Sequence, residues 1–293
     1  MKYFRPETID ETMQLLSKGG GRIIAGGTDL VLDLKSKKVI PDALIDISRI
    51  PQMQTICRDE NRIIIGGAVT HTDAANSALL LAHAPALVAG CRSVGSRQIR
   101  NVATLAGNIV NAQPAADSAV PLAVMNPVFH IQTLDGRRTA SMSEMYAGFG
   151  KSTLDSSREL LTAITLEAED ENEASAYERL ELRGALALPM LCVAARVRLS
   201  NNNTIEWARI AMAPVGIGPV RATDAESYLS GKTPDKSTLH IAGKKALKNA
   251  NPRSNLLRGS REYRVETLPV LVRRALENAC AAIERRREGG ANK

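Results

Sequence analysis

The sequence has few of the residues that build metal centres. Its cysteines are widely separated, and no two of them share a CxxC spacing: Cys57, Cys91, Cys192 and Cys280. The histidines form no HxH or HxxxH pair. Because iron–sulfur clusters and structural zinc need several ligands close together, we expect no protein-bound metal and four reduced thiols.

Long apolar runs and aromatic side chains are also scarce. No stretch of about 18 apolar residues occurs, so we expect no membrane span, and residues 1–16 lack the apolar core of a signal peptide. The formal net charge is +7, but the basic residues are spread along the chain. Aromatics make up only 3% of the residues, too few for base-stacking platforms. We therefore expect a cytoplasmic protein that binds no nucleic acid.

Familiar nucleotide-binding and catalytic fingerprints are absent. No GxGxxG occurs, which removes the support for a Rossmann dinucleotide site. Gly150, Lys151 and Ser152 imitate the end of a phosphate-binding loop, but that motif requires glycine where Met145 stands. There is no GxSxG, no HExxH and no evident cysteine–histidine pair. A Rossmann site, a P-loop and the common hydrolase sites are thus left without support.

Hydrophobic periodicity predicts a mixed α+β chain. In the first part, a helix and three short strands are expected at 7–18, 22–25, 43–48 and 62–69. Helical periods follow at about 72–94 and 118–125, with a loop between them at 104–117. A hairpin with an Asp135-Gly136 turn is expected at 129–140, and a strand at 159–168.

A polar boundary divides the chain. Residues 167–173 read EAEDENE and lack apolar periodicity. Three strands and then three helices are expected beyond them, at 175–183, 190–200, 204–215, 222–230, 236–249 and 262–287. Strands followed by helices are typical of an α+β domain. We therefore expect one domain at 1–170 and a C-terminal α+β domain at 174–288.

Two glycine-containing loops carry the binding chemistry. The first, AGGTDL at 25–30, follows a predicted strand, and its adjacent glycines allow positive φ and expose consecutive N–H groups to an anion. In the second, Thr104, Gly107 and Asn108 bring together a hydroxyl, a bare N–H group and an amide. Asp117 follows, with a carboxylate able to accept bonds from sugar or ribityl hydroxyls. Either loop alone is typical of an ordinary connection, but the pair favours a pyrophosphate held from two sides.

The order of these loops resembles that in one family. AGGTDL at 25–30, QIRNVATLAGN at 98–108 and ADSAVPL at 116–122 are similar to the flavoprotein subunits of xanthine dehydrogenase and carbon monoxide dehydrogenase. The resemblance covers essentially the whole chain. It implies a PCMH-type (vanillyl-alcohol-oxidase-like) FAD-binding domain of two α/β subdomains, at about 1–55 and 56–170, followed by the C-terminal α+β domain.

The resemblance also implies which residues bind FAD. The first loop matches the pyrophosphate loop of the family: Ile23, Ile24, Ala25, Gly26, Gly27, Thr28, Asp29 and Leu30. The second FAD motif is matched by Thr104, Gly107 and Asn108, and its acidic residue by Asp117. Leu160 or Leu161 lies where the family places an aliphatic residue against the isoalloxazine ring, and Arg179 falls near a position usually held by lysine. No catalytic acid or base is expected in this chain.

The chain departs from the family pattern at two positions near the flavin. The second motif usually has two glycines, and Ala106 replaces the first of them. A methyl group is a modest change if φ is negative there, so we expect FAD binding to survive. Val94 stands where xanthine oxidoreductases carry an aromatic residue beside the flavin.

The family implies an electron-transfer flavoprotein subunit. A small [2Fe–2S] subunit would supply electrons, NAD+ or another acceptor would remove them, and a molybdopterin-binding large subunit would hydroxylate the organic substrate. Two alternatives stay open. One is a self-sufficient flavin oxidase of the same fold, which often attaches its flavin to His or Cys, and neither loop contains such a residue. The other is a non-catalytic nucleotide-binding module.

Overall fold

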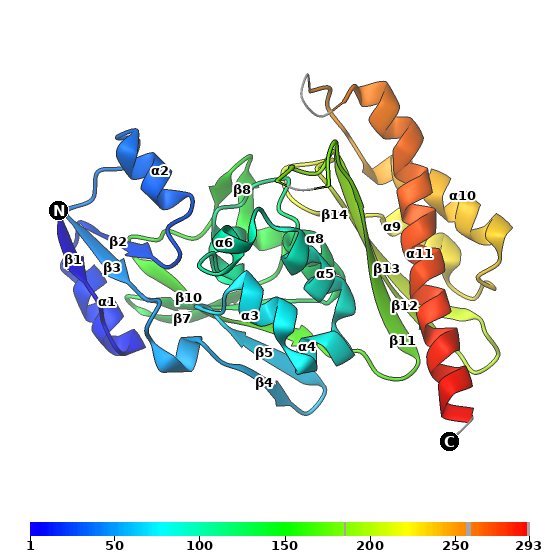
Figure 1. Cartoon of the computed structure of the whole chain (residues 1–293), viewed down its shortest axis with the longest axis horizontal. Coiled ribbons are helices and arrows are strands. Elements are labelled where there is room, and N and C mark those ends of the chain that lie inside the picture. The colour runs from blue at the N-terminus through cyan, green and yellow to red at the C-terminus, as the bar shows by residue number, and fades with distance from the viewer. Residues whose placement is uncertain (185, 256–258, 292–293) are drawn as a thin grey trace.

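Three larger β-sheets follow one another along the long axis of the molecule in the computed structural model (Figure 1). The structure describes residues 1–184, 186–255 and 259–291. The N- and C-termini lie toward opposite ends of the long axis (Figure 1). The expected α+β class is confirmed. No helix within the described ranges has both the length and the apolar character needed to cross a bilayer.

The N-terminal part folds into a small parallel sheet with two helices. The elements, with the strands in sheet order, are β1 (Lys2–Phe4), β3 (Ala43–Asp46), β2 (Gly21–Ile24), α1 (Ile9–Ser17) and α2 (Leu30–Lys35). Helix α1 begins where the Thr8 hydroxyl accepts the Glu11 N–H at 3.1 Å, and it ends before two glycines with positive φ, Gly19 and Gly20. Strand β1 and helix α2 are not predicted from the sequence, because both are too short to show a hydrophobic period.

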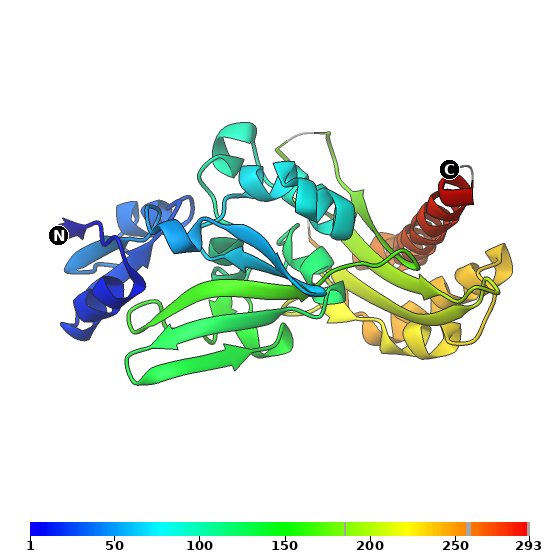
Figure 2. The same cartoon turned by 90° about the horizontal axis from the view of Figure 1, so that it is seen from below.

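The middle of the chain forms a five-stranded antiparallel sheet with helices on one face (Figures 1 and 2). Its strands, in sheet order, are β4 (Ile56–Asp59), β5 (Arg62–Gly66), β10 (Glu159–Glu167), β6 (Val128–Thr133) and β7 (Gly136–Ala140). The helices are α3 (His71–Asn76), α4 (Ala78–His83), α5 (Pro85–Ser93), α6 (Arg97–Arg100), α7 (Leu105–Val110) and α8 (Ala119–Val124). A two-stranded hairpin precedes β10, formed by β8 (Tyr146–Gly148) and β9 (Lys151–Ser152).

One predicted loop is partly helical. Residues 104–117 were expected to form a loop, but Leu105–Val110 form α7. The Thr104 hydroxyl caps this helix, and Leu105 and Ile109 are completely buried. A helix of one or two turns is too short to show a hydrophobic period in the sequence. Helices this short are not stable by themselves, so α7 depends on its cap and on the burial of its apolar side chains.

The C-terminal part is a four-stranded antiparallel sheet covered by helices. Its strands, in sheet order, are β11 (Glu173–Leu180), β12 (Leu191–Leu199), β13 (Ile205–Ala213) and β14 (Val220–Arg221). The helices are α9 (Thr223–Leu229), α10 (Lys236–Ala246) and α11 (Arg261–Ala291), and α11 runs across the sheet (Figure 1). The predicted strands and helices of this part are confirmed, with shifts only at their ends.

Strand β12 joins two hydrophobic cores. Val193 and Ala195 pack in the core that the C-terminal helices cover, whereas Cys192 and Ala194 pack in the core of the five-stranded sheet. Because successive side chains of a strand point to opposite faces, both faces of β12 are buried. This explains its nearly continuous apolar run, and it makes the junction between the two parts a packed apolar surface.

A buried carboxyl group lies at the same junction. Glu169, between β10 and β11, is 2% exposed, and its Oε1 has no hydrogen-bond partner among the described residues. Its Oε2 lies 3.5 Å from Nη2 of Arg286. Burial raises the pKa of Glu169 to about 7, although Ser175, Arg196 and Arg286 oppose the shift.

We expect Glu169→Gln to stabilise the protein above neutral pH. The unfolded carboxyl titrates near 4.5, so between pH 4.5 and about 7 the folded state binds more protons and its stability falls as the pH rises. Glutamine removes this loss, which amounts to roughly 2–3 kcal/mol at pH 8. Denaturant unfolding at pH 8 and at pH ~4.5 measures the effect. An equal gain at both pH values would contradict the explanation.

Candidate functional site

The first glycine loop connects β2 to α2 and leaves its backbone donors unused. Gly27 has a φ of +68°, a conformation that other residues rarely adopt. Within the described part of the chain, the N–H groups of residues 26–30 donate to no protein acceptor. All of these residues are at least partly exposed. Successive free N–H groups in such a loop are suited to an anionic ligand.

The second loop lies directly against the first. A Cβ atom on Gly26 would come within 2.0 Å of the Val102 carbonyl oxygen and 2.8 Å of the Ala103 nitrogen. No side chain fits at this position, so the glycine lets the two backbones touch. On its other side, Ala103 accepts the His71 N–H at 2.9 Å through its carbonyl oxygen. The fold thus brings the two predicted loops together.

Two predicted residues of the second loop bond to each other. Thr104 Oγ1 accepts the Gly107 N–H at 3.0 Å, so this N–H group, which we expected to be free, caps α7 instead. Asn108 Oδ1 accepts the Ser118 hydroxyl at 2.8 Å, while Asn108 Nδ2 has no acceptor among the described residues.

The alanine that replaces a family glycine in the second motif fits the backbone. Ala106 lies within α7 and its φ is not positive, so its methyl group causes no strain.

Asp117 and Arg179 form a largely buried ion pair. Asp117 is 5% exposed, and its Oδ1 accepts the Tyr177 hydroxyl and the Arg179 Nε–H, each at 2.7 Å. Burial raises the pKa of Asp117, and the bonds from Arg179 and Tyr177 oppose that shift. Arg179 also pairs with Glu181. The structure therefore brings two predicted site residues, Asp117 and Arg179, into direct contact. Both donors, Tyr177 and Arg179, lie on β11 and bond to the same carboxylate oxygen of Asp117.

The two predicted aliphatic residues belong to different hydrophobic clusters. Leu160 is 1% exposed and packs with Met53, and Ile23 and Ala25 of the first loop pack against the same cluster. Leu161 is 3% exposed and belongs to the core of the five-stranded sheet. Of the two, Leu160 is the one brought next to the first loop.

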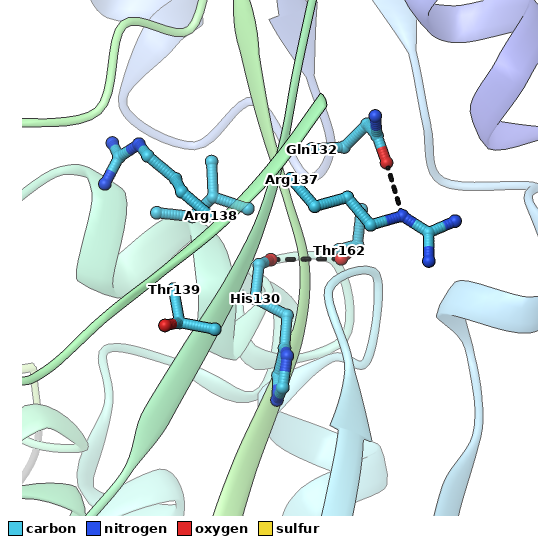
Figure 3. A pocket seen from close by; sticks show the side chains of 7 residues that line it. His130, Gln132, Arg137, Arg138, Thr139 and Thr162 are labelled. Atoms are coloured by element: carbon cyan, nitrogen blue, oxygen red, sulfur yellow. Dashed lines mark hydrogen bonds between the residues drawn. The ribbon is translucent and has the colours of Figure 1, made fainter. Parts of the chain in front are cut away.

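A pocket on the β6–β7 hairpin is separate from both loops. Its volume is about 310 Å³, and its lining includes His130, Gln132, Arg137, Arg138, Thr139 and Thr162 (Figure 3). Arg137 Nε donates to Gln132 Oε1 at 3.1 Å, and Arg138 extends the other way to form two hydrogen bonds with Glu159. No predicted site residue lines this pocket, and both guanidinium groups already have protein partners. It is therefore not the site that the sequence predicts.

Family models identify the protein family to which the two loops belong. Residues 1–166 match the family model described as the FAD binding domain in molybdopterin dehydrogenase, and residues 175–279 match the CO dehydrogenase flavoprotein C-terminal domain. The chain belongs to this flavoprotein family. It is an FAD-binding oxidoreductase subunit of the xanthine dehydrogenase and carbon monoxide dehydrogenase type, so the family and cofactor inferred from the sequence are confirmed.

Relatives of this flavoprotein align over almost the whole chain. The xanthine dehydrogenase FAD-binding subunit of Escherichia coli O157:H7 is 29% identical over 283 residues, 96% of each chain. The carbon monoxide dehydrogenase medium chain of Hydrogenophaga pseudoflava is 28% identical over 282 residues, 96% of this chain and 97% of that one. A solved carbon monoxide dehydrogenase structure from H. pseudoflava matches with a TM-score of 0.88 and 28% identity, covering 97% of this chain and 98% of the other. The expected FAD-binding part and flavoprotein C-terminal domain are confirmed.

The geometry of the two loops suits FAD. Its pyrophosphate needs several donors at close range, and the free N–H groups of residues 26–30 are such donors. Asn108 Nδ2, a further donor with no acceptor among the described residues, lies on α7, which closely follows the residues 102–103 that Gly26 contacts. The residues present therefore fit the cofactor of the family.

Sequence reasoning missed Tyr177 and a group of arginines. Tyr177 stands two residues before Arg179 on β11, and the alternation of a strand would have placed both on one face. Arg92, Arg97 and Arg100 line a pocket together with Arg179. The only sequence signal for these three is the density of positive charge in RSVGSRQIR, just before the second loop.

We expect Asn108→Ala to weaken FAD binding by about tenfold. The change removes the free amide donor and the acceptor of the Ser118 hydroxyl, a loss of about 1–1.5 kcal/mol. Titration of the flavin-free protein with FAD, followed by quenching of flavin fluorescence, measures the dissociation constant. Asn202→Ala, in the exposed β12–β13 turn, is the control and should leave the constant unchanged. An unaltered constant in Asn108→Ala would remove Asn108 from the site.

Proposed function

We propose that this chain is the electron-transfer flavoprotein subunit of a molybdopterin-dependent hydroxylase or dehydrogenase. A small [2Fe–2S] subunit delivers electrons to it, and NAD+ or another acceptor removes them. A molybdopterin-binding large subunit oxidises the organic substrate. The observation that carries the proposal is the contact between the first loop, with its free N–H groups, and the second loop, in a chain of this flavoprotein family.

The flavin, when bound, supplies the redox chemistry, and the protein supplies binding and orientation. We assign binding of the FAD pyrophosphate to the loop at residues 23–30. On the opposing side, Thr104 caps α7 by accepting the Gly107 N–H, and Asn108 on the same helix offers a donor. Leu160, packed in the cluster that Ile23 and Ala25 adjoin, supplies an apolar contact.

Asp117 and Arg179 make up the polar side of the proposed site. The Arg179–Asp117 bond at 2.7 Å fixes the guanidinium on β11, and the second carboxylate oxygen of Asp117 remains for a hydroxyl of the ligand. Leu161, the neighbouring aliphatic residue, packs instead in the core of the five-stranded sheet.

We also propose the domain division drawn from the sequence. The FAD-binding domain spans 1–170, with subdomains at about 1–55 and 56–170, and the C-terminal domain spans 174–288. Sheet membership supports this division, because β1–β3 form one sheet, β4 to β7 with β10 another, and β11–β14 a third. We place the protein in the cytoplasm, in keeping with its free cysteines.

The competing functions make different demands on the chain. A self-sufficient flavin oxidase needs its own substrate pocket over the flavin, often with flavin attached to His or Cys, and neither loop holds such a residue. A non-catalytic nucleotide-binding module would carry no reducible flavin. A yellow protein without oxidase activity would support the subunit over both.

The experiment uses the whole chain with FAD bound. The FAD should be released by acid or heat, since neither loop contains a His or Cys to which flavin could be attached. Mixing the protein with xanthine or nicotinate under anaerobic conditions should leave the flavin oxidised. Adding the reduced [2Fe–2S] partner should bleach its visible absorption. Rapid bleaching by such a substrate with this chain alone would overturn the subunit assignment and favour the oxidase.

A further inference from the structure

Two side chains of β11 hold the carboxylate of Asp117 by one oxygen atom. Tyr177 and Arg179 stand two residues apart on the strand, so both lie on the same face of the sheet. The Tyr177 hydroxyl and the Arg179 Nε–H both donate to Oδ1, each at 2.7 Å. Oδ2 receives no hydrogen bond within the part of the chain that the structure describes. One oxygen is thus bound to the protein, and the other is left for a ligand.

The main chain at Asp117 is held by two helices. A Cβ atom on Gly90 of α5 would come within 2.8 Å of the Asp117 carbonyl oxygen, so α5 lies in direct contact with this residue. The next residue, Ser118, donates its hydroxyl to Asn108 Oδ1 on α7 at 2.8 Å. Because these contacts fix the backbone, the orientation of the carboxylate depends on its side-chain partners on β11.

The two donors on β11 differ in how firmly they are committed to Asp117. Arg179 also pairs with Glu181, so its charge is shared between two carboxylates. The ring of Tyr177 packs against the core of the five-stranded sheet, which fixes the position of its hydroxyl. Burial raises the pKa of Tyr177 well above its usual value, and the neighbouring Cys192 and Asp117 add to this shift. The Tyr177 hydroxyl therefore keeps its proton and remains a donor to Asp117.

The surroundings of Asp117 disfavour its charge. Asp117 is 5% exposed, and burial raises its pKa, whereas the bonds from Arg179 and Tyr177 oppose that shift. Cys192, the strand partner of Arg179 on β12, is buried, and its own pKa is raised, so it stays uncharged. Gly90 on α5 brings no charge. Because Oδ1 already accepts two donors, an incoming proton would go to Oδ2, the oxygen left for the ligand.

We propose that Tyr177 is a positioning residue for FAD, which keeps Asp117 ionised with Oδ2 as an acceptor for a hydroxyl of the cofactor. The inference rests on the proposed function, because Asp117 belongs to the flavin site only there. An ionised carboxylate accepts a stronger hydrogen bond from a hydroxyl than a neutral carboxyl group does. Without the Tyr177 donor, Asp117 takes up a proton more readily. FAD binding then weakens as the pH falls.

The test is a titration of the flavin-free full chain with FAD at about pH 8 and at about pH 5.5, followed by flavin fluorescence. Tyr177→Phe keeps the ring in the core and removes only the hydroxyl. Its dissociation constant should be about threefold or more above that of the unaltered protein at the higher pH. Between the two pH values, it should rise by at least about threefold more than in the unaltered protein. A merely structural role would change the constant by the same factor at both.

A second variant separates the action through Asp117 from a direct effect. Asparagine cannot ionise, so in Asp117→Asn the further change Tyr177→Phe should alter the dissociation constant by less than about twofold at either pH. The matched control is Tyr228→Phe on α9. The Tyr228 hydroxyl has no hydrogen-bond partner among the described residues, so this variant should bind FAD like the unaltered protein at both pH values.

Three results would overturn the inference. These are an unchanged FAD affinity in Tyr177→Phe, an equal loss at both pH values, and a full effect of Tyr177→Phe in the Asp117→Asn background. All three leave the FAD-subunit proposal standing, because the unaltered chain still binds FAD. An unaltered chain that binds no FAD contradicts the proposed function itself, and the inference with it.

Discussion

Gly26→Ala is expected to abolish the retention of FAD during purification. The added Cβ would meet the Val102 carbonyl oxygen at 2.0 Å and its carbonyl carbon at 2.5 Å, and both are main-chain atoms that cannot rotate away. The first loop must therefore move away from the second. Loss of two charge-assisted N–H bonds to the pyrophosphate, at about 1.5–3 kcal/mol each, lowers the affinity by at least about a hundredfold.

The ratio of flavin absorption to protein absorption after gel filtration measures this effect. Gly148→Ala is the matched control, because its Cβ would meet only two side-chain carbons of Lys151, at 3.7 and 3.8 Å, and its φ is not positive. That variant should carry as much FAD as the unaltered protein. Full FAD content in Gly26→Ala would show that the loop contact is not needed and would refute the site.

Arg196→Met is expected to produce the largest loss of stability. Arg196 has 2% of its side chain exposed, pairs with Glu173, and donates to the carbonyl oxygens of Glu167 and Ala168, each at 3.1 Å. Methionine fills similar space but leaves both carbonyl oxygens and Oε2 of the buried Glu173 without the Arg196 donor, while Glu173 Oε1 keeps its bond to Arg198. Removing one partner of a buried ion pair costs about 3–5 kcal/mol. Since the acceptors lie on β10, β11 and the turn between them, the junction of the two parts of the chain should loosen first.

Thermal unfolding measures this loss as a fall in melting temperature of roughly 6 °C or more. Arg273→Met serves as the comparison, because Arg273 pairs with Glu277 one turn away on α11 and both side chains are 33% exposed. An exposed pair of this kind contributes about 0.5 kcal/mol or less, so that variant should melt close to the unaltered protein. Equal effects in the two variants would show that the Arg196 network contributes no more than a surface pair.

Short-range patterns explain which elements could be predicted. The 129–140 hairpin is local, because its turn at Asp135-Gly136 and its two strands are consecutive, and it forms β6 and β7 as expected. The long helix near the C-terminus carries its apolar period over many residues and appears as α11. Elements without enough length for a period, such as α2 and α7, were missed.

Long-range pairing explains what could not be predicted. Strand β10 lies between β5 and β6, which come from positions far apart in the chain, and no local pattern encodes that order. The hydrogen-bond partners of Asp117 also come from a distant part of the sequence. Its bonds to Tyr177 and Arg179 join residues 60 and 62 positions apart, and they exist only because β11 packs beside the second loop.

The sequence by itself determined the α+β class, the two glycine loops and, through their resemblance to a family, the flavin cofactor. These depend on residue identity, since only glycine allows the backbone approach at Gly26, and glycine adopts the positive φ of Gly27 without the strain that a side chain would add. The tertiary structure alone decided which donors are free. It committed the Gly107 N–H to the Thr104 hydroxyl and left those of residues 26–30 without an acceptor in the part of the chain that the structure describes. The reason is physical: whether a polar group is available to a ligand depends on which partners the fold brings within hydrogen-bonding distance.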